Sequence, residues 1–222
     1  MEPSIVALAG PNGAGKSTTG PALVRDTLGV TEYVDADVLA RLSGGSPWAA
    51  GRVMLGQLRG LARARHSFAF ETTLASRSFA PWIANLKSQG WSFHLVFLSL
   101  AGADLAVARV ADRVRHGGHD VPEEVVRRRY QASYRNFLAL YEPLASSWSM
   151  FDTSQGAPQW LGEGGGGALA DRPRLQTQLL KQSGEALRVH QKSGLPLAIW
   201  REGRVAWVSP DEFERGLRAA AP

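Results

Sequence analysis

Residues 5–18 read Ile-Val-Ala-Leu-Ala-Gly-Pro-Asn-Gly-Ala-Gly-Lys-Ser-Thr, and the rest of the chain is interpreted outward from them. Ile5 to Ala9 form a short apolar run, which is typical of a strand buried on both faces of a parallel sheet. Gly10 to Ser17 then match the motif G-x-x-x-x-G-K-[ST] in full. Main-chain N–H groups of such a loop can surround phosphate oxygens, and a helix that begins near Lys16 directs its positive dipole end at the same anion. The order of strand, motif and helix therefore predicts a nucleotide phosphate site rather than a chance glycine-rich turn.

This loop supplies most of the residues that we assign to the nucleotide. They are Gly10, Pro11, Asn12, Gly13, Ala14, Gly15, Lys16, Ser17 and Thr18. Lys16 offers a point charge for the β- and γ-phosphates and is also assigned to catalysis, while the Ser17 hydroxyl can ligate Mg²⁺. The expected cofactors are ATP or GTP, with Mg²⁺.

The composition is that of an ordinary globular chain with a basic surplus. Its 222 residues are 44% hydrophobic and 20% charged, enough for one α/β domain and a small appendage. There are no cysteines, which excludes disulfides and thiolate zinc sites. The net charge of +5 suits an anionic ligand, but no ordered basic–aromatic pattern marks a nucleic-acid surface. Neither a signal peptide nor a long apolar span is visible, so we expect a cytoplasmic protein with no membrane partner.

Strand and helix patterns alternate along the first two thirds of the chain. Strands are expected over residues 5–9, 32–39, 67–73, 91–100 and 148–152, and helices over residues 16–28, 47–65, 78–89, 103–115 and 123–140. Such alternation predicts an α/β fold of the phosphate-loop NTPase type (kinase-like), with a parallel sheet and helices on both of its faces. Ligands of these sheets bind beyond the carboxyl ends of the strands.

The last third of the chain is expected to be a small α+β appendage. Residues 155–173 are rich in glycine and are interpreted as a linker or surface loop. A helix over residues 174–192 and a hairpin over residues 197–208 follow, before a final capped helix. We therefore expect a kinase-like domain over residues 1–156 and an accessory segment over residues 157–222.

Two carboxylates, Asp35 and Asp37, end the second expected strand. A kinase must place an acceptor hydroxyl in line with the γ-phosphate and remove its proton, which a strand-end carboxylate can do. Asp37 is the predicted base, and Asp35 and the following Arg41 are assigned to the substrate. Either acid is also suited to holding Mg²⁺ through water. The alternative is that both acids only cap the next helix.

Glu71, Thr72 and Thr73 end the third expected strand. We expect Glu71 near the metal or the acceptor, and all three side chains can hydrogen-bond substrate hydroxyls. The alternative for Glu71 is a solvated acid at a strand end.

Several arginines flank a glycine pair, Gly117-Gly118, as expected for a lid that closes over a nucleotide. Arg109 is assigned to the nucleotide and Arg113 to catalysis, because arginines stabilise the charge of a transferring phosphoryl group. The alternative for each is a solvated helix face. His116, in the same connection, shows no metal-ligand spacing with its neighbour His119, and both are expected to be structural or solvated.

Four segments in this order resemble the zeta toxin family, and the resemblance covers about residues 4–153. They are residues 10–18, Val34-Asp-Ala-Asp37, Phe70-Glu-Thr-Thr-Leu74 and residues 109–122. The chromosomal branch of the family, often described only as predicted ATPases, is the most similar. The resemblance implies a kinase for the 3′-hydroxyl of UDP-N-acetylglucosamine, with an antitoxin protein as partner.

The resemblance also implies roles for single residues. Lys16 matches the phosphate-loop lysine, and Asp37 matches the catalytic base. Glu71 and Thr73 match contacts to the sugar, and Arg113 is similar to a phosphate-binding arginine. The chain departs from the family at His119, because the toxins have an arginine three residues before the lid proline.

Three alternative functions stay open from the sequence. One is a kinase for another metabolite, such as a nucleoside or a free sugar. A nucleotide-dependent ATPase or switch without kinase activity is the second, because the phosphate loop is common to all these classes. The third is a binding module that has lost catalysis.

Overall fold

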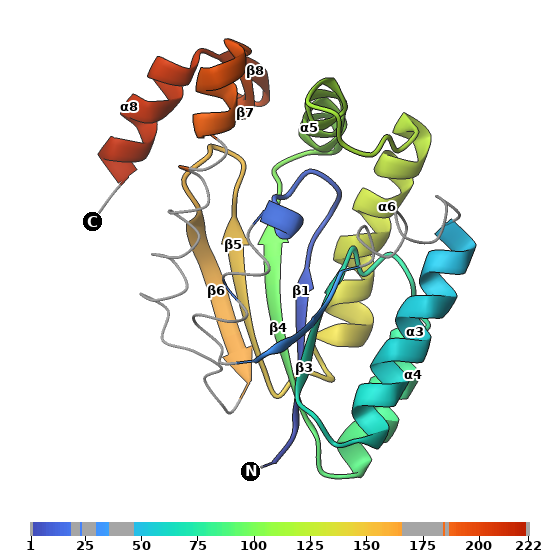
Figure 1. Ribbon diagram of the computed structural model, residues 1–222. Helices are drawn as coiled ribbons and strands as arrows, with labels where there is room; N and C mark the ends of the chain where they lie inside the picture. Colours follow the sequence, from blue (N-terminus) through green and yellow to red (C-terminus); the bar gives the residue numbers. More distant parts are fainter. Residues whose placement is uncertain are drawn as a thin grey trace.

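The computed structural model describes residues 2–18, 23, 30–35, 47–165, 184 and 187–220. They form one six-stranded sheet in the order β2-β3-β1-β4-β5-β6, shown in Figure 1, and a separate two-stranded hairpin. The main sheet contains β1 (Ser4–Ala9), β2 (Glu32–Val34), β3 (Phe68–Thr72), β4 (Ser92–Ser99), β5 (Ser147–Asp152) and β6 (Gln159–Gly165). Every pairing is parallel except that of β6 with β5, which is antiparallel. The predicted α/β class with a parallel sheet is confirmed.

The main sheet lies at the centre of the fold, since its inner strand β1 is buried on both faces. Ile5 to Ala9 of β1 are all fully buried, as the unbroken apolar run predicted. The register pairs Ala9 with Thr72 of β3 on one side and with Phe97 of β4 on the other. The carboxyl ends of β1 and β3 therefore lie level, next to the loop that follows β1.

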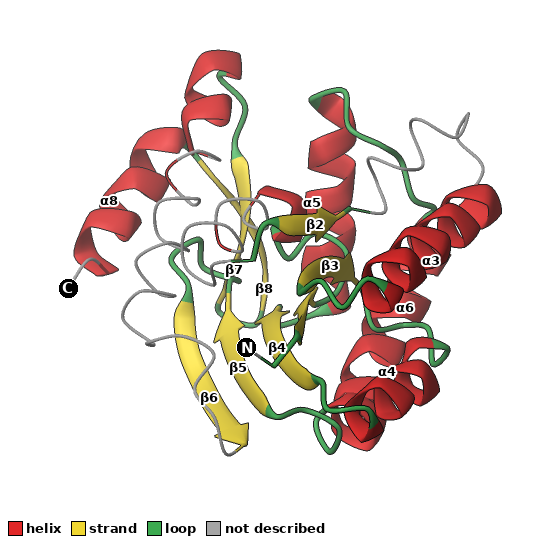
Figure 2. Ribbon diagram, turned by 60° about the horizontal axis from the view of Figure 1, so that its bottom comes forward, coloured by secondary structure: helices red, strands yellow, loops and turns green. Residues whose placement is uncertain are grey.

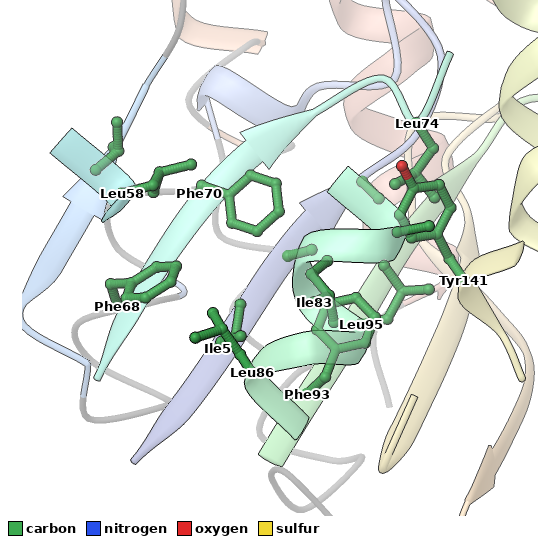
Figure 3. Close-up of a cluster of buried hydrophobic side chains, with 14 of the residues drawn as sticks. Ile5, Leu58, Phe68, Phe70, Leu74, Ile83, Leu86, Phe93, Leu95 and Tyr141 are labelled. Atoms are coloured by element: carbon green, nitrogen blue, oxygen red, sulfur yellow. The ribbon is translucent and has the colours of Figure 1, made fainter. Parts of the chain in front are cut away.

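Three helices cover one face of the sheet: α3 (Pro47–Arg63), α4 (Phe79–Ser88) and α6 (Glu123–Asn136), which continues into the π-helical turn η2 (Phe137–Tyr141). Figure 2 shows these helices together on one side of the strands. Figure 3 shows the aromatic and aliphatic side chains packed between the two layers. They include Ile5, Phe68, Phe70, Phe93 and Leu95 from the strands, with Leu58, Ile83, Leu86 and Tyr141 from the helices. Burying each such side chain fully contributes about 1.5–3 kcal/mol.

On the other face, near the phosphate loop, the described residues include the helix α5 (Ala103–Arg115). Its buried side carries Leu105, Ala106 and Val110. The sequence spacing of Val107, Val110, Ala111 and Val114 predicts a different buried stripe, and this prediction is wrong for Ala111 and Val114, which are exposed. These residues pack with Leu8 of β1 and Leu98 of β4.

The C-terminal module comprises helical residues 187–193, β7 (Leu197–Arg201), β8 (Arg204–Val208) and α8 (Pro210–Ala220). It has a small core of its own, centred on Ile199, Val208 and Phe213. Figure 1 shows it beside α5, at the end of the sheet toward which β4 points. The hairpin and the final helix were predicted, and the Ser209 Oγ cap accepts a hydrogen bond from the Glu212 amide at 3.2 Å.

The expectation of a linker over residues 155–173 is wrong for residues 159–165, which form β6. Gly164 pairs directly with Trp148 of β5, and a Cβ at Gly164 would lie 2.6 Å from the indole Nε1. Glycine is needed here for the close approach of an aromatic ring rather than for flexibility. The division of the chain at residue 156 stays a prediction.

Two expected helices lie mostly outside the described residues. Of the first, residues 16–18 are described and helical, and of the helix over 174–192, residues 187–192 are described and helical. Among the helices that the structure describes, none has the length and apolar character needed to cross a membrane.

Candidate functional site

The phosphate loop takes its shape from glycines pressed against neighbouring backbone. Gly10 has φ +140°, and a Cβ there would lie 2.1 Å from the Leu98 carbonyl oxygen of β4. Gly13 has φ +80°, and its Cβ would lie 3.1 Å from the Ala106 carbonyl oxygen of α5. The loop therefore lies against β4 and α5 at the carboxyl end of the sheet.

Lys16 is the buried cation of this loop, with 6% of its surface exposed. Its ammonium donates a hydrogen bond to the Pro11 carbonyl at 2.9 Å and lies 3.8 Å from Glu71 Oε1. A buried charge needs such partners to offset its lost hydration. Both partners are hydrogen-bond-accepting oxygens, as the oxygens of a phosphate group are.

Glu71 is brought to the loop by the parallel pairing of β3 with β1, which places it opposite Leu8. Ser17 Oγ donates a hydrogen bond to Glu71 Oε1 at 3.1 Å, and the Tyr33 hydroxyl donates one to Oε2 at 3.3 Å. The alternative of a solvated strand-end acid is wrong, because Glu71 is only 9% exposed. The structure thus unites the predicted residues Lys16, Ser17 and Glu71.

The contribution of Tyr33 was missed by the sequence reasoning. Tyr33 lies on β2 and pairs with Ala69 of β3, so its side chain reaches the Glu71 carboxylate from the neighbouring strand. Tyr33 lies two residues before Asp35, so in an extended strand their side chains point to the same face. That spacing was the only signal in the sequence.

The residues at this edge fit Mg²⁺ by the chemistry of their donor atoms. Ser17 Oγ and Glu71 Oε1 are hard oxygen donors 3.1 Å apart, next to a loop built for phosphate. Mg²⁺ prefers a few protein oxygens, completed by water and phosphate oxygens.

Thr72 and Thr73 shape the turn that follows β3. The Leu74 amide donates to Thr72 Oγ1 at 3.0 Å, and the Ala75 amide donates to Thr73 Oγ1 at 3.4 Å. Leu74 has φ +53°, and its carbonyl accepts a hydrogen bond from Asn136 Nδ2 at 2.7 Å. The hydroxyls are therefore held at the strand end, and their contact with substrate stays a prediction.

Arg109 links three parts of the molecule through its guanidinium. Nη1 donates to the Gly13 carbonyl at 3.4 Å, Nη2 to those of Thr153 and Ser154 at 2.8 and 3.1 Å, and Nε to that of Ala198 at 3.1 Å. Burial lowers the pKa of Arg109 to about 10, which leaves it charged at neutral pH. The alternative of a solvated helix face is wrong for Arg109. These contacts support a role in holding the loop, and direct contact with nucleotide stays a prediction.

Arg113 and the glycine pair close the end of α5. The amide of Gly118 donates to the Arg113 carbonyl at 2.9 Å, and Arg113 Nη2 donates to the His119 carbonyl at 2.7 Å. Gly117 has φ +81°, which a helix C-cap requires. The pair is thus a helix stop in this arrangement, and the catalytic role of Arg113 stays a prediction.

The remaining predicted residues flank β2. Asp35 directly follows the last residue of β2 and is half-buried. The predicted base Asp37 and the predicted substrate residue Arg41 lie outside the described residues.

No protein-family model matches the chain. It is similar to an uncharacterised protein of Haemophilus influenzae (strain ATCC 51907 / DSM 11121 / KW20 / Rd), with 27% identity over 135 residues. The matched region is 59% of this chain and 94% of that relative.

The fold is similar to those of several solved structures. A chain from the PezAT chromosomal toxin–antitoxin system of Streptococcus pneumoniae aligns with a TM-score of 0.53 at 12% identity, over 86% of this chain and 88% of that chain. A chain of the native AvrRxo1-ORF1:-ORF2 complex aligns with a TM-score of 0.58 at 15% identity, over 98% and 76%. A chain of the same pair with ATP gives 0.57 at 16% identity, over 80% and 63%. These similarities show a shared fold.

Proposed function

We propose that this chain is a phosphotransferase of the kinase type, which passes the γ-phosphoryl group of ATP or GTP to a hydroxyl of a small acceptor. The observation that carries the proposal is the meeting of Lys16, Ser17 and Glu71 beside a complete phosphate loop. The Lys16 ammonium is 3.8 Å and the Ser17 hydroxyl 3.1 Å from one oxygen of Glu71. Phosphoryl transfer needs an ammonium, a hydroxyl and a carboxylate around the nucleotide and its metal, and these three side chains supply them.

Each of these residues has a defined task in the proposal. Lys16 exchanges the Pro11 carbonyl and the Glu71 carboxylate for the β- and γ-phosphates, so its charge stays paired throughout. Ser17 and Glu71 hold Mg²⁺, which when bound neutralises charge on the phosphate oxygens. Tyr33 orients the Glu71 carboxylate through its hydroxyl. Asp37 removes the proton of the acceptor hydroxyl.

We propose a UDP-N-acetyl sugar, most simply UDP-N-acetylglucosamine, as the acceptor. The support is the ordered set of segments that resembles the zeta toxins. Glu71 and Thr73, which belong to one of these segments, lie together at the end of β3. The fold shared with chains of the PezAT system and of the AvrRxo1-ORF1:-ORF2 complex supports a protein partner that acts as antitoxin.

The test is phosphate transfer from γ-labelled ATP, with Mg²⁺, to UDP-N-acetylglucosamine and to a small-metabolite extract. Asp37→Asn should keep nucleotide affinity and lose about 10²–10⁴-fold in turnover, the usual contribution of a positioned base. Asp120→Asn, in the exposed connection after α5, is the matched control and should behave as the unmodified chain. Normal turnover of Asp37→Asn would remove Asp37 as the base.

The labelled product separates the remaining functions. Label on a nucleoside or free sugar would replace the proposed acceptor while keeping the kinase class. Release of phosphate without any labelled acceptor would indicate an ATPase or switch, and would overturn the proposal.

A further inference from the structure

Asp112, His116 and His190 meet where the C-terminal module lies against α5. One potential ligand atom from each lies within 4.8 Å of those of the other two. His190 Nε2 is 2.7 Å from Asp112 Oδ2, and the two imidazole rings have centroids 4.7 Å apart. None of these three side chains has a task in the proposed phosphoryl transfer.

The cluster is sheltered from water. Asp112 and His190 are 7% and 9% exposed, and the His116 side chain is 18% exposed. It joins residues 78 positions apart in the sequence, so neither α5 nor the C-terminal module forms it alone. Two buried imidazoles and a carboxylate are polar groups that must be satisfied by each other or by a ligand.

Hydrogen bonding around His116 assigns one role to each of its ring nitrogens. The Asp112 carbonyl accepts from His116 Nδ1 at 2.9 Å, so in the neutral ring Nε2 carries the lone pair. Ser193 Oγ lies 3.0 Å from that Nε2 and 3.2 Å from the His190 carbonyl. A hydroxyl has one proton and two lone pairs, so Ser193 Oγ can donate to the carbonyl and accept a hydrogen bond from the proton that His116 Nε2 carries in the charged ring. A metal ion at Nε2 would take the place of that proton.

The ligand types select a class of metal. Two imidazoles with one carboxylate suit Zn²⁺ and similar transition metals, whereas Mg²⁺ and Ca²⁺ prefer oxygen. Asp112 lies on α5, and His116 is the C-cap residue of that helix four positions later, so both side chains lie on the same side of its last turn. A hydrogen bond from the second ring nitrogen to a main-chain carbonyl, as His116 makes, is the usual support of a metal-bound histidine.

We propose that Asp112, His116 and His190 bind one Zn²⁺-class ion, which fastens the C-terminal module to α5. The guanidinium of Arg115 lies 3.1 Å from Asp112 Oδ1 and over the Trp207 ring. This fixed positive charge keeps the carboxylate monodentate and limits the affinity. Since Arg109 of α5 bonds both Gly13 and Ala198, the ion also steadies the phosphate loop through the module.

The test is titration of the full-length, tag-free, EDTA-treated protein with Zn²⁺ alone, in a large excess of Mg²⁺ that occupies oxygen-ligand sites. We expect one Zn²⁺ per chain by calorimetry and a rise in the unfolding temperature. Co²⁺ should give the absorption spectrum of a tetrahedral nitrogen–oxygen site.

Matched variants separate a metal site from a purely hydrogen-bonded cluster. His190→Gln and the milder His116→Gln should each weaken Zn²⁺ binding at least tenfold, since even loss of an outer partner costs about 10–100-fold. His119→Gln, an exposed histidine of the same connection, should bind as the unmodified chain. Absence of Zn²⁺ binding, or equal binding by both cluster variants and the control, would overturn the proposal. So would a loss of stability in the variants that is the same in EDTA and in Zn²⁺.

Discussion

The guanidinium of Arg109 joins the phosphate loop to two other segments of the molecule. Its hydrogen bonds end on main-chain carbonyls of the loop, of the segment after β5 and of β7. The Ser154 carbonyl also accepts a hydrogen bond from the Trp200 amide of β7 at 3.0 Å. The side chain therefore adds to the main-chain hydrogen bonds where three segments meet.

Arg109→Lys should destabilise the protein by about 1–3 kcal/mol, because a lysine cannot reach all four carbonyls and hydrogen bonds from a charged donor are lost. It should also weaken nucleotide binding, since Gly13 loses its support. Urea unfolding and nucleotide titration measure the two effects. Arg127→Lys, whose guanidinium pairs with Asp104 and Glu123 on the surface, should leave both unchanged. Equal effects of the two variants would contradict the role given to Arg109.

The turn of the hairpin formed by β7 and β8 contains a small backbone strain. Its turn residues, Glu202 and Gly203, have φ +52° and +76°, the left-handed pair of a type I′ turn. Gly203 adopts this conformation without cost, whereas a glutamate does so against its steric preference.

Glu202→Asn should stabilise the protein by about 0.5–1 kcal/mol, because asparagine tolerates this conformation and favours the turn. Gly203→Ala should act in the opposite direction. Thermal unfolding of both variants beside the unmodified chain measures the difference. A lower unfolding temperature for Glu202→Asn would show that this turn does not limit the stability of the C-terminal module.

Most elements followed from short stretches of sequence, and β6 shows why one did not. The apolar run of β1 and the turn of the hairpin are local patterns with local causes. β6 is rich in glycine, so its sequence resembles that of a linker. Its strand conformation depends on pairing with β5 and on room for Trp148, and neither is visible within residues 159–165.

The stability of the whole fold should depend on pH through His94, which lies between β4 and β5. Its Nδ1 is 2.8 Å from Ser147 Oγ and its Nε2 is 3.1 Å from Ser92 Oγ. Burial, and then the charge of Lys87, lower the pKa of His94 below 6.5. The unfolded chain therefore binds the proton more readily than the native protein does.

The free energy of unfolding should consequently be highest above pH 6.5 and fall as the pH drops through the native pKa of His94. His94→Gln should remove this part of the pH dependence, whereas His66→Gln, an exposed histidine before β3, should retain it. Urea unfolding at several values between about pH 5 and 8 measures the slopes. Identical slopes for His94→Gln and the unmodified chain would assign the acid sensitivity to other groups.

The candidate site, like the fold, has parts that the sequence predicts and parts that depend on tertiary packing. The phosphate loop and its Lys16 were readable because closely spaced glycines and a lysine predict an anion site by themselves. Glu71 was expected near the metal, but its contacts with Lys16, Ser17 and Tyr33 depend on the pairing of β3 with β1 and β2. Arg109 was expected to bind nucleotide, and in the folded structure its guanidinium donates hydrogen bonds to main-chain carbonyls.

The linear order of residues was thus sufficient for the phosphate loop, the strand and helix pattern and the α/β class, since each depends on neighbours within a few positions. Packing of distant segments alone placed β6 at the sheet edge, Arg109 at its junction and His190 against Asp112. The physical reason is that these positions are governed by contacts between residues outside one short stretch, such as Trp148 with Gly164 and Asp112 with His190. Such contacts depend on shape and on burial, which no short stretch of sequence encodes.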